Sequence, residues 1–463
     1  MLRLAIIGGG PGGLVTAYFL DRKCNRRIST TLFEATDRVG GKIVTRLFDN
    51  APYIYEAGVA EIYGYHRLGP DPLRRIIKNL GLPTVPMQGG TVVLGNRIMR
   101  DAADIKRHFG KKTLKAIQDF RRKGSTLLSP SEYYNAGWPC DNRHAWKRQS
   151  FDAILDRIPD GNARRYLRVA VHSDLASEPH EVSGFFGLEN CLMDDPRYVR
   201  LYSIEGGLER FPQALRTRIT ADVRLNHQVT SVEKESGQYR VTWRHQGCTN
   251  AADYDCVVVA LPNCWLPAIH WSGKSLETAM RNHHAYYDLP AHYLRITVLF
   301  REPFWRKLIS GSYFQLDAFG GCCVYDEGTR HEAGSYGVLS WLLGGQQAML
   351  LGNEADDNLI RKALDSLPIS LRVPDGSFIE GHVHRWVGVV TAEPDGHIVK
   401  GAKLRHLPDP KHHPGLLVVG DYLFDSTING VVDSSDIVTD LVAKLPARQH
   451  HVRAHPAGAA GAA

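Results

Sequence analysis

Residues 4–14 of the chain read LAIIGGGPGGL, and this stretch decides the fold. An apolar run of strand type leads into a G-x-G-x-x-G motif formed by Gly8, Gly10 and Gly13, and apolar residues then recur at helical spacing. A second strand-like run ends in Glu34, 21 residues after Gly13. The order of strand, glycine turn, helix, strand and acid predicts a dinucleotide-binding unit.

Each residue of this motif has a physical task in such a unit. Gly8 permits a tight turn, Gly10 lets the backbone approach a pyrophosphate at the helix N-terminus, and Gly13 lets helix and strand pack closely. Glu34 is placed to accept hydrogen bonds from ribose hydroxyls, and its charge disfavours NADP. The alternative is a strand-to-helix turn that needs glycine for packing alone.

The residues after Glu34 indicate which dinucleotide is bound. Gly40 and Gly41 offer bare backbone N–H groups, and the flanking Arg38 and Lys42 offer two cations to a diphosphate. This segment resembles the E-x-x-x-R-x-G-G-[RK] signature of the flavin-containing amine oxidase, protoporphyrinogen oxidase and phytoene desaturase superfamily. The resemblance implies that the cofactor is FAD.

Composition limits the class of protein. With 463 residues the chain is too long for one ordinary core and suggests two domains, and 43% apolar with 23% charged residues is typical of a soluble globular protein. A formal charge of +7 is mild for this length and indicates no nucleic-acid surface. No apolar run is long enough to span a membrane, and a strand at the first residues leaves no room for a leader, so we expect a cytoplasmic protein.

The eight cysteines are scattered, which favours reduced thiols that serve mainly in packing. Cys322 and Cys323 are adjacent, but neighbours on a strand face opposite sides, so a redox pair is disfavoured. The histidines show no ligand spacing, and we expect no metal site.

The resemblance covers nearly the whole chain and is thin between residues 85 and 200. It is strong at both ends and clear at residues 204–262 and 295–305. Residue spacing further predicts helices near residues 71–80, 151–158 and 163–171, one strand over residues 223–233 and a buried parallel strand over residues 255–262. The resemblance implies an α/β fold with a discontinuous Rossmann-like FAD-binding domain and an α+β substrate-binding domain. The FAD-binding domain is assigned residues 1–80, 201–270 and 380–445, the substrate-binding domain residues 81–200 and 271–379, and a disordered tail residues 446–463.

The glycine motifs and the resemblance together assign the FAD contacts. No cysteine lies between residues 387 and 420, where some relatives tether the flavin, so we expect FAD to be bound non-covalently. The cofactor-binding set comprises Gly8, Gly10, Pro11, Gly12, Gly13, Glu34, Ala35, Arg38, Gly40, Gly41, Lys42, Gly58, Val59, Val229, Gly420, Asp421, Asn429 and Gly430.

Three residues are the candidates for the catalytic site. Arg295 stands where many amine oxidases carry a lysine that binds a water beside the flavin, and it is either a cation near the flavin or a structural salt-bridge partner. Glu61 would repel a carboxylate and hold an ammonium, unless it is a solvated loop acid. Trp386 would form a wall of the flavin site or pack in the core. Thr427 stands where monoamine oxidases place an aromatic-cage tyrosine, so that cage looks incomplete.

The favoured function is oxidation of the C–N bond of an amine or amino acid, with hydride passing to flavin N5 and then electrons to O2 or another acceptor. The first alternative is C–C desaturation or ring oxidation of a biosynthetic intermediate, suggested by Arg295 and the incomplete cage. The second is a flavin-dependent isomerase or an FAD-binding module. Substrate identity, electron acceptor and the question of a homodimer stay open.

Overall fold

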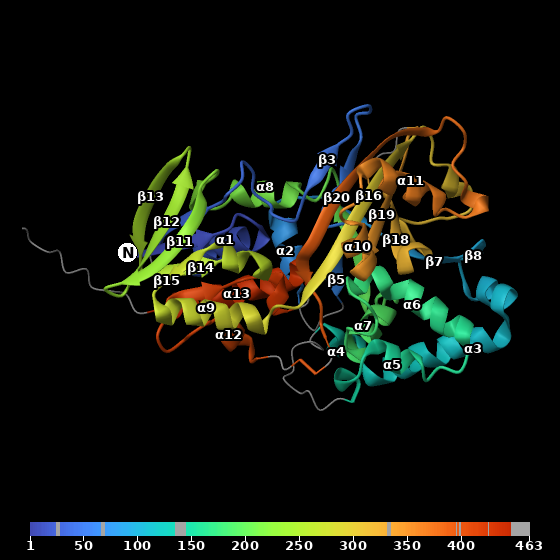
Figure 1. The fold of residues 1–463 in the computed structure, drawn as a ribbon, viewed down its shortest axis with the longest axis horizontal. Coiled ribbons are helices and arrows are strands. Elements are labelled where there is room, and N and C mark those ends of the chain that lie inside the picture. The colour runs from blue at the N-terminus through green and yellow to red at the C-terminus, as the bar shows by residue number, and fades with distance from the viewer. Residues whose placement is uncertain are drawn as a thin grey trace, which may run out of the picture.

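The computed structural model describes residues 1–24, 28–65, 70–134, 145–330, 335–394, 396–397, 400–424 and 426–445. Cys140 and the tail predicted over residues 446–463 lie outside the described residues. Helices and sheets alternate through two halves of different sheet type, so the predicted α/β class is confirmed (Figure 1). Within the described ranges, no helix combines the length and the apolar character needed to cross a bilayer.

A five-stranded parallel sheet forms the base of one half, as the glycine motif predicts. Its outer strand β21 lies beside β14, the buried parallel strand expected at residues 255–262. In spatial order its strands are β10 (Asp222–Arg224), β2 (Ile28–Phe33), β1 (Leu2–Ile7), β14 (Cys256–Val259) and β21 (Leu416–Val418).

Both faces of this sheet are covered, as a parallel sheet requires. Leu4 and Ile6 of β1 pack into one core cluster, which includes the helices α1 (Pro11–Lys23) and α13 (Ile428–Lys444). Ala5 and Ile7 pack into a second cluster on the other face. Because α1 starts directly after the carboxyl end of β1, its N-terminus lies at the sheet edge where the glycine loop sits.

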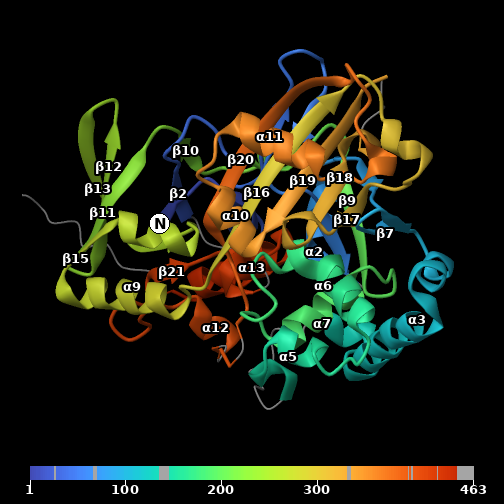
Figure 2. The same cartoon turned by 45° about the vertical axis from the view of Figure 1, so that its right-hand side comes forward.

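A four-stranded sheet covers that second face at one end of the molecule (Figures 1 and 2). The single strand predicted over residues 223–233 is wrong, because the chain forms two strands that belong to different sheets. Asn226, with φ of 57°, turns the chain between them, and its N–H donates to Thr36 O at 2.8 Å. The sheet contains β13 (Cys248–Tyr254), β12 (Gln238–His245), β11 (Gln228–Glu235) and β15 (His270–Ser272).

The other half is built on a seven-stranded mixed sheet. Strand β16, which lies next to the edge strand β20, begins at Pro290 and carries Arg295, and the long β20 reaches back toward the parallel sheet. The order is β20 (Phe378–Thr391), β16 (Pro290–Phe300), β19 (Gly337–Gly344), β18 (Cys322–Asp326), β17 (Tyr313–Leu316), β7 (Gly89–Leu94) and β8 (Arg97–Met99).

Helices cover this sheet and two small sheets join the halves. The helices predicted near residues 71–80, 151–158 and 163–171 are all present as α2, α5 and α6. The small sheets are β3 (Thr45–Leu47) with β4 (Ile54–Glu56), and β5 (Ile62–Tyr65), β9 (Val199–Ile204) and β6 (Thr84–Pro86). The remaining helices are α2 (Pro72–Asn79), α3 (Ala102–Leu127), α4 (Pro130–Tyr133), α5 (Phe151–Leu155), α6 (Gly161–Leu175), α7 (Gly184–Met193), α8 (Arg210–Arg216), α9 (Lys274–Tyr286), α10 (Gly345–Leu351), α11 (Asp356–Asp365) and α12 (Ala402–Arg405).

The adjacent cysteines face opposite sides of β18. Cys322 packs into the core cluster on one side of the sheet and Cys323 into the cluster on the other. Burial raises the pKa of both thiols far from the range in which thiolates form. Both cysteines therefore serve in packing.

The turn at Asn226 gives a prediction about stability. Replacing Asn226 by Val should lower the free energy of unfolding by about 1–2 kcal/mol, because a β-branched residue adopts positive φ only under strain. Asn226→Gly should change it by less than about 0.5 kcal/mol, since glycine accepts this conformation freely. Denaturant unfolding of the two variants measures both changes, and equal midpoints would show that the turn does not depend on this conformation.

Candidate active site

The glycine loop between β1 and α1 is closed by the approach of its own backbone. Gly8 has φ of 114° and donates from its N–H to Phe33 O at 2.8 Å. A Cβ on Gly13 would lie 2.0 Å from Gly8 O, and a Cβ on Gly41 would lie 3.2 Å from Gly10 Cα. The two glycine segments predicted to hold a diphosphate therefore face each other at contact distance.

Glu34 ends β2 directly beside this loop. Its Oε2 accepts from Gly9 N at 2.7 Å and its Oε1 from Thr36 N at 2.9 Å. Thr36 Oγ1 also donates to Oε1 at 2.8 Å, so Oε2 keeps the second lone pair that could accept from a ribose hydroxyl. The carboxylate thus fixes the loop in the position where the sequence predicted a dinucleotide.

The two cations that flank the second glycine pair bind protein groups. Arg38 NH1 donates to Val39 O at 3.0 Å and its NH2 to Gly41 O at 2.6 Å, so Arg38 braces the loop and does not present a free fork to a diphosphate. Lys42 Nζ donates to Val389 O at 3.0 Å and forms an ion pair with Asp421. Two predicted FAD ligands, Lys42 and Asp421, are therefore neighbours although 379 positions separate them.

Residues 57–60, which include Gly58 and Val59 of the predicted cofactor-binding set, accept hydrogen bonds from three side chains. Trp386 Nε1 donates to Ala57 O at 2.8 Å, and Arg295 NH1 donates to Gly58 O at 2.7 Å. Arg330 NH1 donates to Ala60 O. On the other side Val59 N donates to Lys42 O at 3.1 Å, which ties the segment to the glycine loop. We call residues 57–60 the flavin-side segment.

The two arginines share one carboxylate in the interior. Arg295, Arg330 and Glu327 are each no more than 1% exposed. Glu327 Oε1 accepts from Arg295 NH2 at 2.9 Å, and its Oε2 lies 3.4 Å from Arg330 NH1. Arg295 Nε also donates to Ser340 Oγ at 2.7 Å. Every guanidinium nitrogen of Arg295 thus makes a hydrogen bond, and the fully buried side chain has the contacts of a structural salt-bridge partner, one of the two roles expected of it.

Glu56 adds a titratable group behind the flavin-side segment. Its carboxyl group is 1% exposed and accepts from Leu208 N at 2.8 Å and from Thr45 Oγ1 at 2.9 Å. Burial raises the pKa of Glu56 to about 7, and the nearby Arg330 opposes the rise. Near neutral pH this cluster of charges therefore carries a net positive charge.

A cavity of about 120 Å³ lies between the helices and the C-terminal part of β20. Aromatic rings dominate its wall, and three carboxylic acids join them, while no lysine, arginine or histidine is among the described residues of the lining. Its lining residues are Tyr63, Tyr65, Tyr133, Tyr134, Asp174, Leu175, Ala176, Phe186, Glu189, Asn190, Met193, Tyr293, Val390, Thr391, Glu393, Phe424, Ser426 and Thr427.

Asp174 is the acid of this wall with the most unusual environment. It lies in the last turn of α6, where the helix dipole is negative and a carboxylate is unfavourable. Burial, with Glu61 and Asp194 nearby, holds the pKa of Asp174 well above its usual range. Tyr63 OH donates to Glu61 Oε1 at 3.2 Å, and Glu61 Oε2 is buried with no partner among the described residues.

The N-terminus of α13 lies beside the cavity. Thr427 caps this helix by accepting from Gly430 N at 3.1 Å, and it also lines the cavity. Asn429 is 2% exposed, and both polar atoms of its amide lack a hydrogen-bond partner within the described part of the chain. Such an orphaned buried amide calls for a polar ligand. Gly420 and Asp421 are at the same end of the parallel sheet, directly after β21.

One group of possible metal ligands lies away from these residues. One ligand atom each of Asp49, Glu380 and His382 lie within 4.8 Å of one another. Glu380 already accepts from Asp49 N at 2.9 Å, from Asn50 N at 2.7 Å and from His382 Nε2 at 2.9 Å. These contacts explain the group as an anchor for the β3–β4 loop.

Comparison with known proteins identifies the family. A family model described as flavin-containing amine oxidoreductase matches residues 11–443. The chain belongs to this family. It is 25% identical over 342 residues to the flavin-dependent L-tryptophan oxidase of Lentzea aerocolonigenes, covering 66% of this chain and 67% of that one. It is 24% identical over 345 residues to the flavin-containing amine oxidase A of Canis lupus familiaris, covering 66% of this chain and 58% of that one.

Solved structures confirm the fold. Putrescine oxidase bound to putrescine superposes with a TM-score of 0.74 at 18% identity, covering 96% of this chain and 99% of that chain. Cyclohexylamine oxidase from Brevibacterium oxydans gives 0.72 at 17% identity, with 96% and 98% covered. A protein described as a putative protoporphyrinogen oxidase from Exiguobacterium gives 0.68 at 19% identity, with 96% and 98% covered. The superfamily resemblance and the two-domain α/β fold are therefore confirmed.

The chain is an FAD-dependent oxidoreductase of this family, and FAD is bound non-covalently. The residues present fit FAD on two observations. The glycine loop is so tight that a Cβ on Gly8 or on Gly13 would lie 2.5 Å and 2.0 Å from a carbonyl oxygen, and the amide of Asn429 is left for a ring acceptor and donor. The individual FAD contacts assigned from the sequence, including Val229 on β11, stay proposals.

The sequence analysis missed the residues that line the cavity. Tyr63 and Tyr65 alternate along β5 and therefore share one face, which is a signal that could have been read. Asp174 gives a second signal of this kind, because the helix dipole makes a carboxylate unfavourable in the last turn of a helix. Only tertiary packing brings these residues together with Phe424 and Thr391.

Gly13 gives a test of the cofactor loop. Gly13→Ala should displace Gly8 and reduce the FAD-to-protein absorbance ratio at least about tenfold, because forcing a Cβ into this contact costs on the order of 2 kcal/mol. Gly401→Ala is the matched control, since nothing lies within 4 Å of a Cβ at that position. Full flavin content in Gly13→Ala would contradict the close approach.

Glu327 gives a test of the buried charges. Glu327→Gln should lower the free energy of unfolding by about 3 kcal/mol, because it leaves two buried arginines without their shared counter-ion. The control is Glu302→Gln, an exposed acid that follows β16, which should shift the free energy by less than about 0.5 kcal/mol. Equal denaturation midpoints for the two variants would show that Glu327 does not carry this structure.

Proposed function

We propose that this enzyme oxidises a small amine that carries no carboxylate, at the carbon next to nitrogen. The observation that carries the proposal is the cavity wall, in which aromatic rings and carboxylic acids meet without a basic residue among those the structure describes. An ammonium ion suits both groups, because it binds to aromatic faces and to carboxylates.

The charge of the cavity argues against an amino acid as substrate. A substrate carboxylate needs an arginine, a lysine or a similar donor, and the described part of the chain places none in the cavity lining. Arg295 is buried and fully engaged with Glu327, Ser340 and Gly58. Among the relatives, the names of putrescine oxidase and cyclohexylamine oxidase agree with this reading better than that of the tryptophan oxidase.

The volume of the cavity indicates a small substrate. About 120 Å³ is slightly less than the roughly 150 Å³ of a cavity that holds one benzene molecule. A C–C desaturase acting on a large apolar intermediate would need a longer, uncharged cavity. The cavity therefore favours the amine over the desaturase alternative, whose support is Arg295 and the incomplete cage.

Asp174 would be the counter-ion of the substrate. Its position at the end of α6 and its burial beside Glu61 both oppose the ionised form, and a bound ammonium would relieve both. Tyr63 and Tyr293 would exclude water and stay neutral, because burial holds the pKa of each phenol well above the usual range. When bound, FAD accepts the hydride that leaves the carbon next to nitrogen.

Several assignments from the sequence belong to this proposal. Glu61 would act with Asp174 on the cationic end of the substrate, and Arg295 and Trp386 would position the flavin-side segment. The division into an FAD-binding domain of residues 1–80, 201–270 and 380–445 and a substrate-binding domain of the intervening residues is likewise proposed. It agrees with the origin of the parallel-sheet strands.

The test is the isosteric variant Asp174→Asn. We expect KM for the best amine to rise about 30-fold, equivalent to about 2 kcal/mol, with a smaller change in kcat, because a charge partner is removed. The same variant should be more stable by about 1 kcal/mol, since the raised pKa means that the ionised group opposes folding. That gain should vanish below about pH 4, where the carboxyl is protonated in both states.

The matched control is Asp156→Asn, the same change on a side chain that is 65% exposed outside the cavity. Kinetics on a panel of amines and amino acids, with anaerobic bleaching of the flavin, and thermal unfolding provide the measurements. A variant with unchanged kcat/KM for every amine would show that nitrogen is not bound at Asp174. Bleaching by amino acids and not by simple amines would contradict the proposed substrate class.

A further inference from the structure

Most of the net charge of the protein lies on one helix. α3 (Ala102–Leu127) contains eight lysines and arginines and two aspartates, a net charge of +6, whereas the whole chain carries +7. The rest of the molecule is therefore close to neutral. Charge this concentrated indicates an interaction surface more than a general aid to solubility.

The cations of α3 gather on one face. At 100° per residue, five exposed cations after Gly110 fall within an arc of about 120°, and the residues buried against the body lie on the opposite side. We call this arc the α3 basic face. It consists of Lys111, Lys112, Lys115, Arg122 and Lys123.

The α3 basic face works against the stability of its own helix. Lys111 and Lys115 stand four residues apart, a spacing at which like charges repel. Gly110, with φ of 89°, interrupts the helix, so Lys111 and Lys112 begin the second stretch, where the dipole disfavours cations. Within the described residues, no acid pairs with Lys111, Lys112 or Lys115, whereas Arg122 pairs with Asp119 at 2.8 Å.

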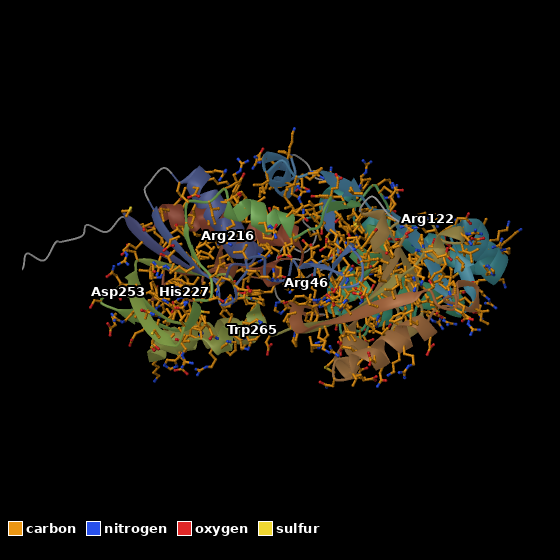
Figure 3. The ribbon with its side chains drawn as sticks, turned by 90° about the horizontal axis from the view of Figure 1, so that it is seen from above. Arg46, Arg122, Arg216, His227, Asp253 and Trp265 are labelled. Carbon is orange, nitrogen blue, oxygen red and sulfur yellow. The ribbon has the colours of Figure 1, made fainter. Side chains whose placement is uncertain are left out.

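All five side chains of the face are exposed among the described residues, and Lys123 also lies over the Trp146 ring at 5.5 Å. α3 packs along α6 and α7 and lies at the end of the molecule opposite the β11–β13 sheet (Figures 1 and 2). In the view from above, Arg122 is at one end, and His227 and Asp253 are at the other (Figure 3). Ile117 and Phe120 are buried in the core cluster beneath α3, so the face offers charge and no large exposed apolar side chain.

We propose that the α3 basic face docks this enzyme on an anionic phospholipid surface. Four of its five cations are lysines, which act as point charges toward a diffuse anionic surface and are depleted in protein–protein interfaces. Because α3 lies flat on α6 and α7, it cannot enter a groove of duplex nucleic acid as recognition helices do. A line of lysines about 18 Å long matches a flat array of headgroups.

Docking would be electrostatic and peripheral. Each cation near an anionic bilayer is worth about 1 kcal/mol, which is about a fivefold change in the partition coefficient. Three such charges then give roughly a hundredfold change. Because no apolar side chain inserts, binding should disappear at 1 M salt, where the screening length falls to about 3 Å.

The experiment is sedimentation of the full-length holoenzyme with vesicles of phosphatidylglycerol and phosphatidylcholine at low salt. The triple variant Lys111→Gln, Lys112→Gln and Lys115→Gln should lose binding about a hundredfold. The matched control replaces the exposed Lys78, Lys274 and Lys307 by Gln, which changes the net charge equally, and it should bind within a few-fold of the parent. The flavin spectrum shows that each variant is folded.

Three results would overturn the proposal. They are absence of binding of the parent to anionic vesicles, equal losses in the triple variant and the control, and tighter binding of the parent to duplex DNA than to vesicles at the same salt. None of these measurements uses an amine substrate, so the docking proposal and the proposed function stand or fall separately.

Discussion

The carboxylate of Glu327 between Arg295 and Arg330 is the interaction on which the site depends. Arginine cannot shed its proton, so two arginines are tolerated in the interior only with a shared counter-ion and with carbonyl acceptors. The acceptors they use are Gly58 O and Ala60 O. A buried ion pair is weak evidence for stability in general, but here it fixes the backbone of the flavin-side segment, which joins the glycine loop to the substrate cavity.

The parts of the fold that follow local rules were predictable from the sequence. The strand, glycine turn and helix of residues 2–23 depend on glycines whose Cβ positions are blocked by neighbouring backbone, so the pattern has one structural solution. Asp71 begins α2 by accepting from Leu73 N and Arg74 N, as its spacing before the apolar positions indicated. The structure of such motifs is determined by interactions among residues that are close in the sequence.

The cavity was not predictable, because its wall is assembled from distant segments. Tyr63 comes from β5, Asp174 from α6 and Thr391 from the end of β20, and no spacing in the sequence links them. Thr427 leaves the expected aromatic cage incomplete at one position, but tyrosines of other elements supply aromatic walls to the cavity. The single strand predicted over residues 223–233 was wrong for a different reason. Polar and apolar residues continue to alternate across Asn226, whereas the backbone turns there at a positive φ.

Charge of opposite sign lies on the two sides of the flavin-side segment. Arg295 and Arg330 donate to the carbonyl groups of the segment, and Asp174 lines the cavity. Glu61 lies close enough to both Arg330 and Asp174 to help raise the pKa of each. Such an arrangement favours positive charge in the cavity and negative charge at the segment itself. In the proposed oxidation, the hydride leaves the carbon next to nitrogen and the positive charge stays on the iminium product in the cavity, which this arrangement favours. Asp174 lies at the end of a helix, where its charge lowers the stability of the fold, and this local cost accompanies the separation of charge.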